Sequence, residues 1–110
     1  MPPATHRVRV CRLHEFPPGT VRRLNTLPPV VVFNVAGRLY AIDDVCSHAW
    51  AVLSEGHFDG TSLECPVHLS RFDVRSGEPL CPPATEPLRT HEVEISGDEV
   101  VVHVDIGRPL

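Results

Sequence analysis

Two short segments of this chain each place a cysteine just before a histidine. One residue separates Cys46 from His48, two separate Cys65 from His68, and sixteen residues lie between the two pairs. Thiolates and imidazoles are common metal ligands, so the pairs indicate one metal centre with two ligands of each kind. Ligands at positions i and i+2 cannot both reach one iron from a helix. The fold must therefore bring two separate loops together around the metal.

The mixed ligand set favours a [2Fe-2S] cluster, with zinc as the alternative. Structural zinc sites also use two cysteines and two histidines, but they usually place like residues at the short spacings. Two ferric ions, two sulfides and two cysteinates sum to zero charge, whereas four cysteinates would leave a dianion. Adding an electron to a neutral site meets less Coulomb repulsion, so histidine ligation raises the reduction potential. The residues thus predict a one-electron carrier.

The sequence around the pairs also matches a known family. The matching stretches are FNVAGRLYAIDDVCSH (Phe33 to His48), LSEG (Leu53 to Gly56), ECPVHLSRFDVRSGEP (Glu64 to Pro79) and PPATEPL (Pro82 to Leu88). In them the chain resembles the Rieske-type [2Fe-2S] ferredoxins of bacterial aromatic-ring-hydroxylating dioxygenase systems, and it is similar to the biphenyl dioxygenase ferredoxin. The resemblance implies that Cys46 and Cys65 bind one iron, and that His48 and His68 bind the other, nearer the surface.

The same resemblance implies a fold and a function. The fold is an all-β Rieske fold, an antiparallel β-sandwich of small stacked sheets, with a cluster-binding lobe over about residues 43–85. The length of 110 residues supports one domain, 1–110. The implied function is to carry single electrons from an NADH-dependent flavoprotein ferredoxin reductase to a terminal oxygenase, so the chain itself is not an enzyme. Because no G-x-G-x-x-G pattern is present, we expect no direct binding of NADH or FAD.

Two other functions stay open at this point. The chain could be the small Rieske subunit of another oxidoreductase, such as nitrite reductase. It could also be a zinc-stabilised interaction module without a redox role. The sequence does not identify the aromatic substrate, the individual partners or the oligomeric state.

Several residues near the ligands are candidates for supporting roles. Ser70 is a candidate hydrogen-bond donor to a sulfur atom, whereas Phe72 stands where high-potential relatives carry tyrosine. Ala51 and Val67 replace two cysteines that cross-link the loops in those relatives. Fewer donors to sulfur favour a low potential within the Rieske range, about −150 mV. Apolar residues in expected loops either dock a partner or shield the cluster: Trp50, Leu69, Pro82 and Pro83.

Charge and composition limit the partners. The net charge of −4 disfavours nucleic acid and anionic membranes and favours basic protein partners. Acidic residues near the ligands either steer docking or form a solvated face. These residues are Asp43, Asp44, Glu55, Asp59 and Glu64.

The location is also limited by the sequence. The first ten residues contain no apolar signal segment, and no continuous apolar stretch is long enough to span a bilayer, so we expect a cytoplasmic protein. Cys11 and Cys81 are expected to be free thiols without a function.

Twelve prolines, and the lack of an apolar stripe with a 3.6-residue period, favour strands over helices. Alternating or continuous apolar runs predict strands over residues 7–13, 30–35 and 38–42. Two hairpins are expected, one with its tip at Asp59 and Gly60, the other joining residues 92–95 to 100–104 through a turn at 96–98. Cys65 would then directly follow a strand. The family resemblance implies that Pro82 to Thr85 form a third loop over the cluster.

Overall fold

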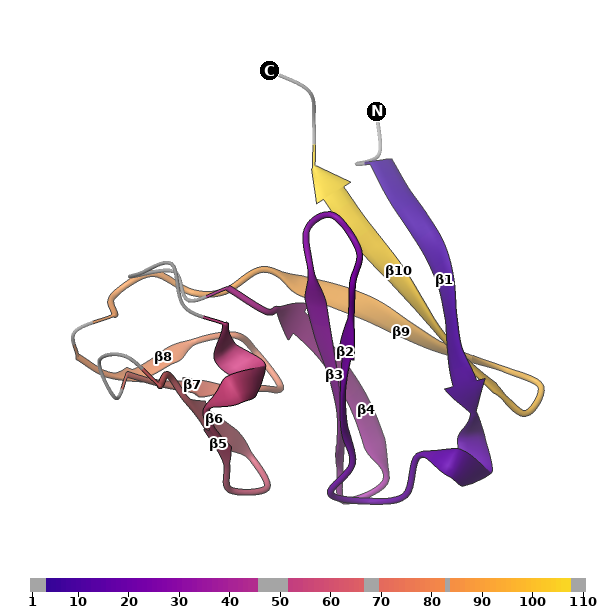
Figure 1. Cartoon of the computed structure of the whole chain (residues 1–110), viewed down its shortest axis with the longest axis horizontal. Helices are drawn as coiled ribbons and strands as arrows, with labels where there is room; N and C mark the ends of the chain where they lie inside the picture. Colours follow the sequence, from indigo (N-terminus) through magenta and orange to yellow (C-terminus); the bar gives the residue numbers. More distant parts are fainter. Residues whose placement is uncertain (1–3, 46–51, 67–69, 83, 108–110) are drawn as a thin grey trace.

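The computed structural model describes residues 4–45, 52–66, 70–82 and 84–107. Within them, ten strands form two antiparallel sheets, of six strands in the order β1-β10-β9-β4-β3-β2 and of four strands in the order β5-β6-β7-β8 (Figure 1). Two 3₁₀ turns, η1 (Leu13–Glu15) and η2 (Leu53–Glu55), precede β2 and β5. The strands are β1 (Ala4–Arg12), β2 (Val21–Leu24), β3 (Val30–Val35), β4 (Arg38–Asp43), β5 (His57–Phe58), β6 (Ser62–Glu64), β7 (Arg71–Asp73), β8 (Pro79–Cys81), β9 (Thr90–Ser96) and β10 (Glu99–Gly107).

Strand β3 is buried on both faces. Val30 and Val32 belong to one apolar cluster, together with valines of β10, whereas Val31 and Phe33 belong to a second cluster with residues of the four-stranded sheet. Successive side chains of a strand point to opposite faces, so a strand covered on both sides needs apolar residues at every position. This requirement explains the uninterrupted run of Val30 to Phe33.

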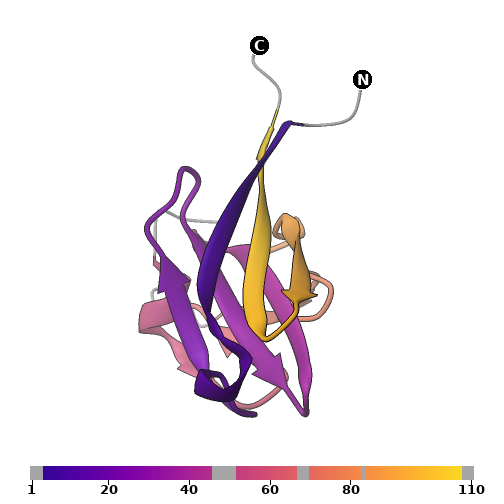
Figure 2. The same cartoon turned by 90° about the vertical axis from the view of Figure 1, so that its right-hand side faces the viewer.

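The six-stranded sheet bends around the first of these clusters. Val8 of β1 and Val100 of β10 pack in the same cluster as Val30 of β3, although β10 and β3 are separated by two strands in the sheet order. The sheet therefore curves over on itself, as the turned view shows (Figure 2). A register shift between Arg9 and Cys11 interrupts the pairing of β1 with β10. Such a bulge increases local bending and twist.

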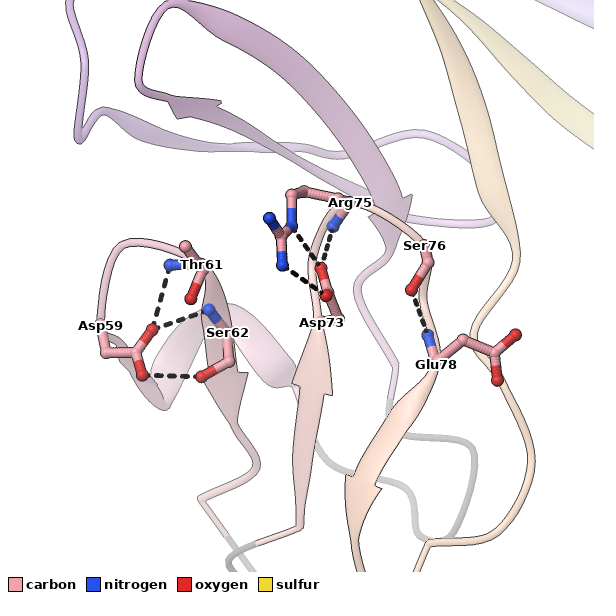
Figure 3. Close-up of polar contacts among 7 residues, drawn as sticks. All are labelled: Asp59, Thr61, Ser62, Asp73, Arg75, Ser76 and Glu78. Carbon is pink, nitrogen blue, oxygen red and sulfur yellow. Dashed lines mark hydrogen bonds and ion pairs between the residues drawn. The ribbon is translucent and has the colours of Figure 1, made fainter.

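The four-stranded sheet is inserted in the chain between β4 and β9 and packs beside the larger sheet (Figure 1). Its strands form a meander, so the β5–β6 and β7–β8 turns lie at one end and the β6–β7 connection lies at the other. Each of the two turns is closed by an aspartate, as Figure 3 shows. Asp59 accepts N–H groups of Thr61 and Ser62, and Asp73 accepts the N–H and guanidinium groups of Arg75. These turns fix the end of the sheet that is remote from the β6–β7 connection.

Asp59 should make stability depend on pH in acid. Hydrogen bonds from the Thr61 and Ser62 N–H groups, and then from the Ser62 hydroxyl, lower the pKa of Asp59 to about 2. The unfolded value is about 3.9, so this stabilisation is present above about pH 4 and is lost as the pH falls towards 2. We expect Asp59→Ala to lower the melting temperature at pH 6, and the difference from the wild type to shrink between about pH 4 and 2. Thermal unfolding followed by circular dichroism measures both melting temperatures across this pH range. If their difference did not change with pH, the lowered pKa of Asp59 would be contradicted.

Most of the expected strands are confirmed, and the all-β antiparallel fold is confirmed with them. The strands at 7–13, 30–35 and 38–42 and both hairpins correspond to β1, β3, β4, β5–β6 and β9–β10. The turn between β3 and β4 has a positive φ of 52° at Ala36 and of 95° at Gly37. Strands β2, β7 and β8 were not predicted, because they are short and their residues show little apolar alternation. The described residues contain no helix with the length and hydrophobicity that crossing a bilayer requires.

Candidate metal centre

Of the four predicted ligands, the structure describes Cys65. Its side chain is fully buried and, as predicted, follows β6 directly. Cys46, His48 and His68 lie outside the described residues. The same holds for Trp50, Leu69 and Pro83, and also for Ala51 and Val67. The described part of the centre therefore consists of Cys65 and of the residues at the ends of both ligand segments.

The segment that carries Cys65 and His68 is closed at its base by the backbone. The Cys65 N–H donates to the Ser70 carbonyl oxygen at 2.6 Å, and the neighbouring pair Glu64 and Arg71 continues the β6–β7 ladder. An ion pair between Arg71 Nη2 and Glu64 Oε2, at 3.2 Å, lies on this same pair. Cys65 and Ser70 thus lie opposite each other at the end of a regular hairpin.

Ser70 connects this loop to the third one. Its side chain is fully buried, and its hydroxyl oxygen accepts the N–H of Ala84 at 3.2 Å. Ala84 belongs to the segment from Pro82 to Thr85, which follows β8 and contains no strand among its described residues. Pro82 is exposed, whereas Ala84 is buried in the same apolar cluster as Cys65. The described part of the third loop is therefore held against the base of the second.

The segment that carries Cys46 and His48 also has paired ends. Val45 and Val52 form an antiparallel bridge, and the Leu53 N–H donates to the Asp44 carbonyl oxygen at 3.1 Å. Leu53 begins η2 and is fully buried beside Cys65 in the second apolar cluster. The far end of the first ligand segment is thereby brought next to the start of the second.

Gly56 makes this juxtaposition close. It follows η2, and its N–H donates to the Leu53 carbonyl oxygen at 2.9 Å. A Cβ atom at this position would overlap the carbonyl oxygen of Glu64, the residue just before Cys65. With φ of −84° and ψ of −161°, the backbone itself does not require glycine. The glycine is required by the contact between η2 and β6.

The acidic residues near the ligands were expected either to steer docking or to form a solvated face, and for Asp44 both interpretations are wrong. Asp44 is fully buried and bound to Arg23 and Ser54. Asp43 forms an ion pair with Arg89 and accepts a hydrogen bond from His91, Glu64 pairs with Arg71, and Asp59 closes its own turn. Glu55 is exposed. Asp43 and Asp44 lie where β4 ends, at the junction of the two sheets, and their carboxylates anchor the chain there.

His91 was assigned no role from the sequence, yet it is buried at the same junction. Its Nδ1 accepts the N–H of Asp105 at 2.8 Å, so Nε2 carries the proton and donates to Asp43 Oδ1 at 2.7 Å. The alternation of β9 could have located it, because residue 91 shares a face with the apolar residue Val93 of the same strand. The Asp43 N–H also donates to the Arg89 carbonyl oxygen at 2.9 Å. These contacts join the segments entering and leaving the four-stranded sheet.

Comparison with known proteins identifies the family. The model of the Rieske [2Fe-2S] domain matches residues 6–92. The chain belongs to the Rieske [2Fe-2S] domain family. Among curated relatives of this Rieske protein are the 3-phenylpropionate/cinnamic acid dioxygenase ferredoxin subunits of Shigella boydii serotype 4 (strain Sb227) and Escherichia coli (strain K12). Each is 38% identical over 105 residues, which cover 94% of this chain and 99% of the relative.

Solved structures agree with these relatives. A chain from the complex of reduced oxygenase and oxidized ferredoxin in carbazole 1,9a-dioxygenase is 40% identical, with a TM-score of 0.84, over 94% of this chain and 96% of that one. The ferredoxin of carbazole 1,9a-dioxygenase from Nocardioides aromaticivorans IC177 is 37% identical, with a TM-score of 0.82, over 89% and 97%. The predicted family, the Rieske fold and the role as an electron-transfer component are confirmed.

The described residues fit a [2Fe-2S] cluster, which is the cofactor of this family. Cys65 supplies a buried thiol in apolar surroundings, at the base of a loop closed by Ser70. Burial and hydrogen bonding around the sulfur atoms are the means by which a protein sets the potential of such a cluster. The two other cysteines among the described residues lie elsewhere, Cys11 in β1 and Cys81 in β8. Burial raises the pKa of the Cys11 thiol, which makes that residue less reactive.

Proposed function

We propose that this Rieske ferredoxin carries single electrons from an NADH-dependent flavoprotein reductase to a terminal oxygenase that hydroxylates an aromatic ring. One observation carries the proposal. The present chain matches a chain from a complex of oxygenase and ferredoxin, and the match covers 96% of that other chain. The curated relatives matched over 99% of their length are named as dioxygenase ferredoxin subunits. A cytoplasmic location is proposed with this function.

The names of the relatives that are matched over nearly their whole length support an electron carrier. The ferredoxin chains are matched over 96–97% of their length. Another chain from the carbazole 1,9a-dioxygenase structures is 22% identical and matched over 30% of its length, with a TM-score of 0.79. That likeness shows the fold alone. The ferredoxins are therefore matched over nearly their whole length, whereas the longer chain is matched over less than a third of its own.

The protein residues in this function bind and shield the cluster. When bound, a [2Fe-2S] cluster accepts and releases one electron at a time. We assign Cys46 and Cys65 as ligands of one iron and His48 and His68 as ligands of the other, within a lobe of about residues 43–85. Ser70 is proposed to donate its hydroxyl proton to a sulfur atom, because its oxygen already accepts the Ala84 N–H. Four apolar residues are proposed to surround the histidines: Trp50, Leu69, Pro82 and Pro83.

Reconstitution tests the proposal. The holoprotein is mixed with NADH, a flavoprotein ferredoxin reductase, a ring-hydroxylating terminal oxygenase and an aromatic substrate. We expect hydroxylated product only when the iron-loaded ferredoxin is present, and none with the iron-free protein. If the reductase reduces the ferredoxin but no ring-hydroxylating oxygenase turns over, while a nitrite reductase does, the proposed partner is wrong.

A further inference from the structure

Asp44 is a fully buried carboxylate placed directly after β4 and two residues before Cys46. Its oxygens accept Arg23 Nε at 2.7 Å, the Ser54 N–H at 2.7 Å and the Ser54 hydroxyl at 2.6 Å. A buried charge is costly unless it is both paired and hydrogen-bonded. Arg23 supplies the opposite charge and Ser54 supplies two further donors. The carboxylate is therefore held in one orientation.

The main chain of the same residue ties together the ends of the first ligand segment. The Asp44 carbonyl oxygen accepts the Leu53 N–H at 3.1 Å, and the next residue, Val45, forms a bridge with Val52. Residues 44–45 and 52–54 are thus linked by backbone bonds and by the Asp44 side chain. The six residues between them include Cys46 and His48. Fixing the ends of so short a loop removes many of its conformations.

The six-stranded sheet anchors this link. Arg23 lies in β2, where it pairs with Val31 of β3, and its guanidinium also donates to the side chain of Asn25. The Asp44 N–H donates to the Pro29 carbonyl oxygen at 2.9 Å, just before β3. One carboxylate therefore connects β2, the end of β4 and η2. The ends of the ligand segment are therefore fixed to the six-stranded sheet, whereas Cys65 follows a strand of the four-stranded sheet.

We propose that Asp44 is a positioning residue for the cluster. It joins residues 44–45 to residues 52–54, which are the two ends of the stretch that contains the proposed ligands Cys46 and His48. Its own oxygens are occupied by Arg23 and Ser54, so it is not a ligand. The proposal depends on the family assignment and is independent of the proposed partners.

The adjacent carboxylate provides a matched control. Asp43 also binds residues at the junction, through an ion pair with Arg89 and a hydrogen bond from His91, but it contacts neither Ser54 nor Arg23 among the contacts of the described residues. We compare Asp44→Asn with Asp43→Asn in the iron-loaded protein, measuring the rate at which a ferrous chelator removes iron and the line width of the EPR signal of the reduced cluster. We expect Asp44→Asn to release iron about tenfold faster than the wild type and to broaden the signal, because a partly broken buried pair loosens the loop ends. Asp43→Asn should release iron and give a line width close to those of the wild type.

A second variant keeps the test decisive if Asp44→Asn does not fold. Ser54→Ala removes one of the three hydrogen bonds to the carboxylate and leaves the ion pair with Arg23 in place. It should fold and give an intermediate rate of iron release. Equal rates in Ser54→Ala and the wild type, or equal acceleration by Asp43→Asn and Asp44→Asn, would overturn the proposal, since the second result would reflect general destabilisation.

Discussion

Replacing Gly56 by alanine is expected to destabilise the four-stranded sheet by about 3 kcal/mol and to prevent stable cluster binding. The added methyl group would overlap the Glu64 carbonyl oxygen and lie 3.2 Å from the Leu53 carbonyl oxygen. Neither backbone atom can move without displacing η2 or the end of β6. Because Cys65 follows β6 directly, the displacement shifts a cluster ligand. Chemical unfolding and the iron content of the purified variant measure the two effects.

Gly60→Ala is the control for this variant. Gly60 lies in the turn of the same hairpin, with φ of +109°, and a Cβ atom there would meet no atom within 4 Å. Its alanine variant should lose about 1–2 kcal/mol through backbone strain and retain full iron content. If Gly56→Ala binds iron as well as Gly60→Ala does, the contact between η2 and β6 does not position Cys65.

Replacing Cys65 by serine is expected to abolish the cluster. Serine keeps the size of the side chain but binds iron much more weakly than a thiolate, and one lost ligand exposes the remaining three to displacement. The purified variant should be colourless, with less than about a tenth of the wild-type iron and sulfide. Iron and acid-labile sulfide analysis measures this, and EPR of the reduced protein confirms loss of the signal.

Two other cysteines serve as matched controls for this substitution. Cys11→Ser places a hydroxyl in the first apolar cluster and should cost about 1–3 kcal/mol of stability without loss of iron. Cys81→Ser changes a half-buried residue of β8 and should also retain the cluster. Loss of iron in either control, or a full cluster in Cys65→Ser, would show that the ligands were assigned incorrectly.

Local sequence patterns were sufficient for much of the fold. The alternation in residues 92–104 predicted the β9–β10 hairpin, and the run of Val30 to Phe33 predicted a buried strand. The spacing of Cys46, His48, Cys65 and His68 predicted the cofactor, because those ligand types at those separations suit few other metals. These features depend on residues close together in the chain, where periodicity and spacing are visible.

Contacts between distant segments could not be predicted in the same way. Asp44 was interpreted as an acidic surface residue, and only the fold shows that Arg23, from β2, and Ser54, from η2, bury and neutralise it. Nothing in the sequence singled out His91. In the fold, its two ring nitrogens are hydrogen-bonded to Asp43 of β4 and to Asp105 of β10.

The sequence by itself determined the ligand chemistry, the family and the β-rich fold of this ferredoxin. The tertiary structure alone decided that Asp44 is buried against Arg23 and Ser54, and that the contact between η2 and β6 requires Gly56. The physical reason is that these interactions join residues far apart in the chain, and the charge or size of a residue does not reveal which partner the fold will place beside it.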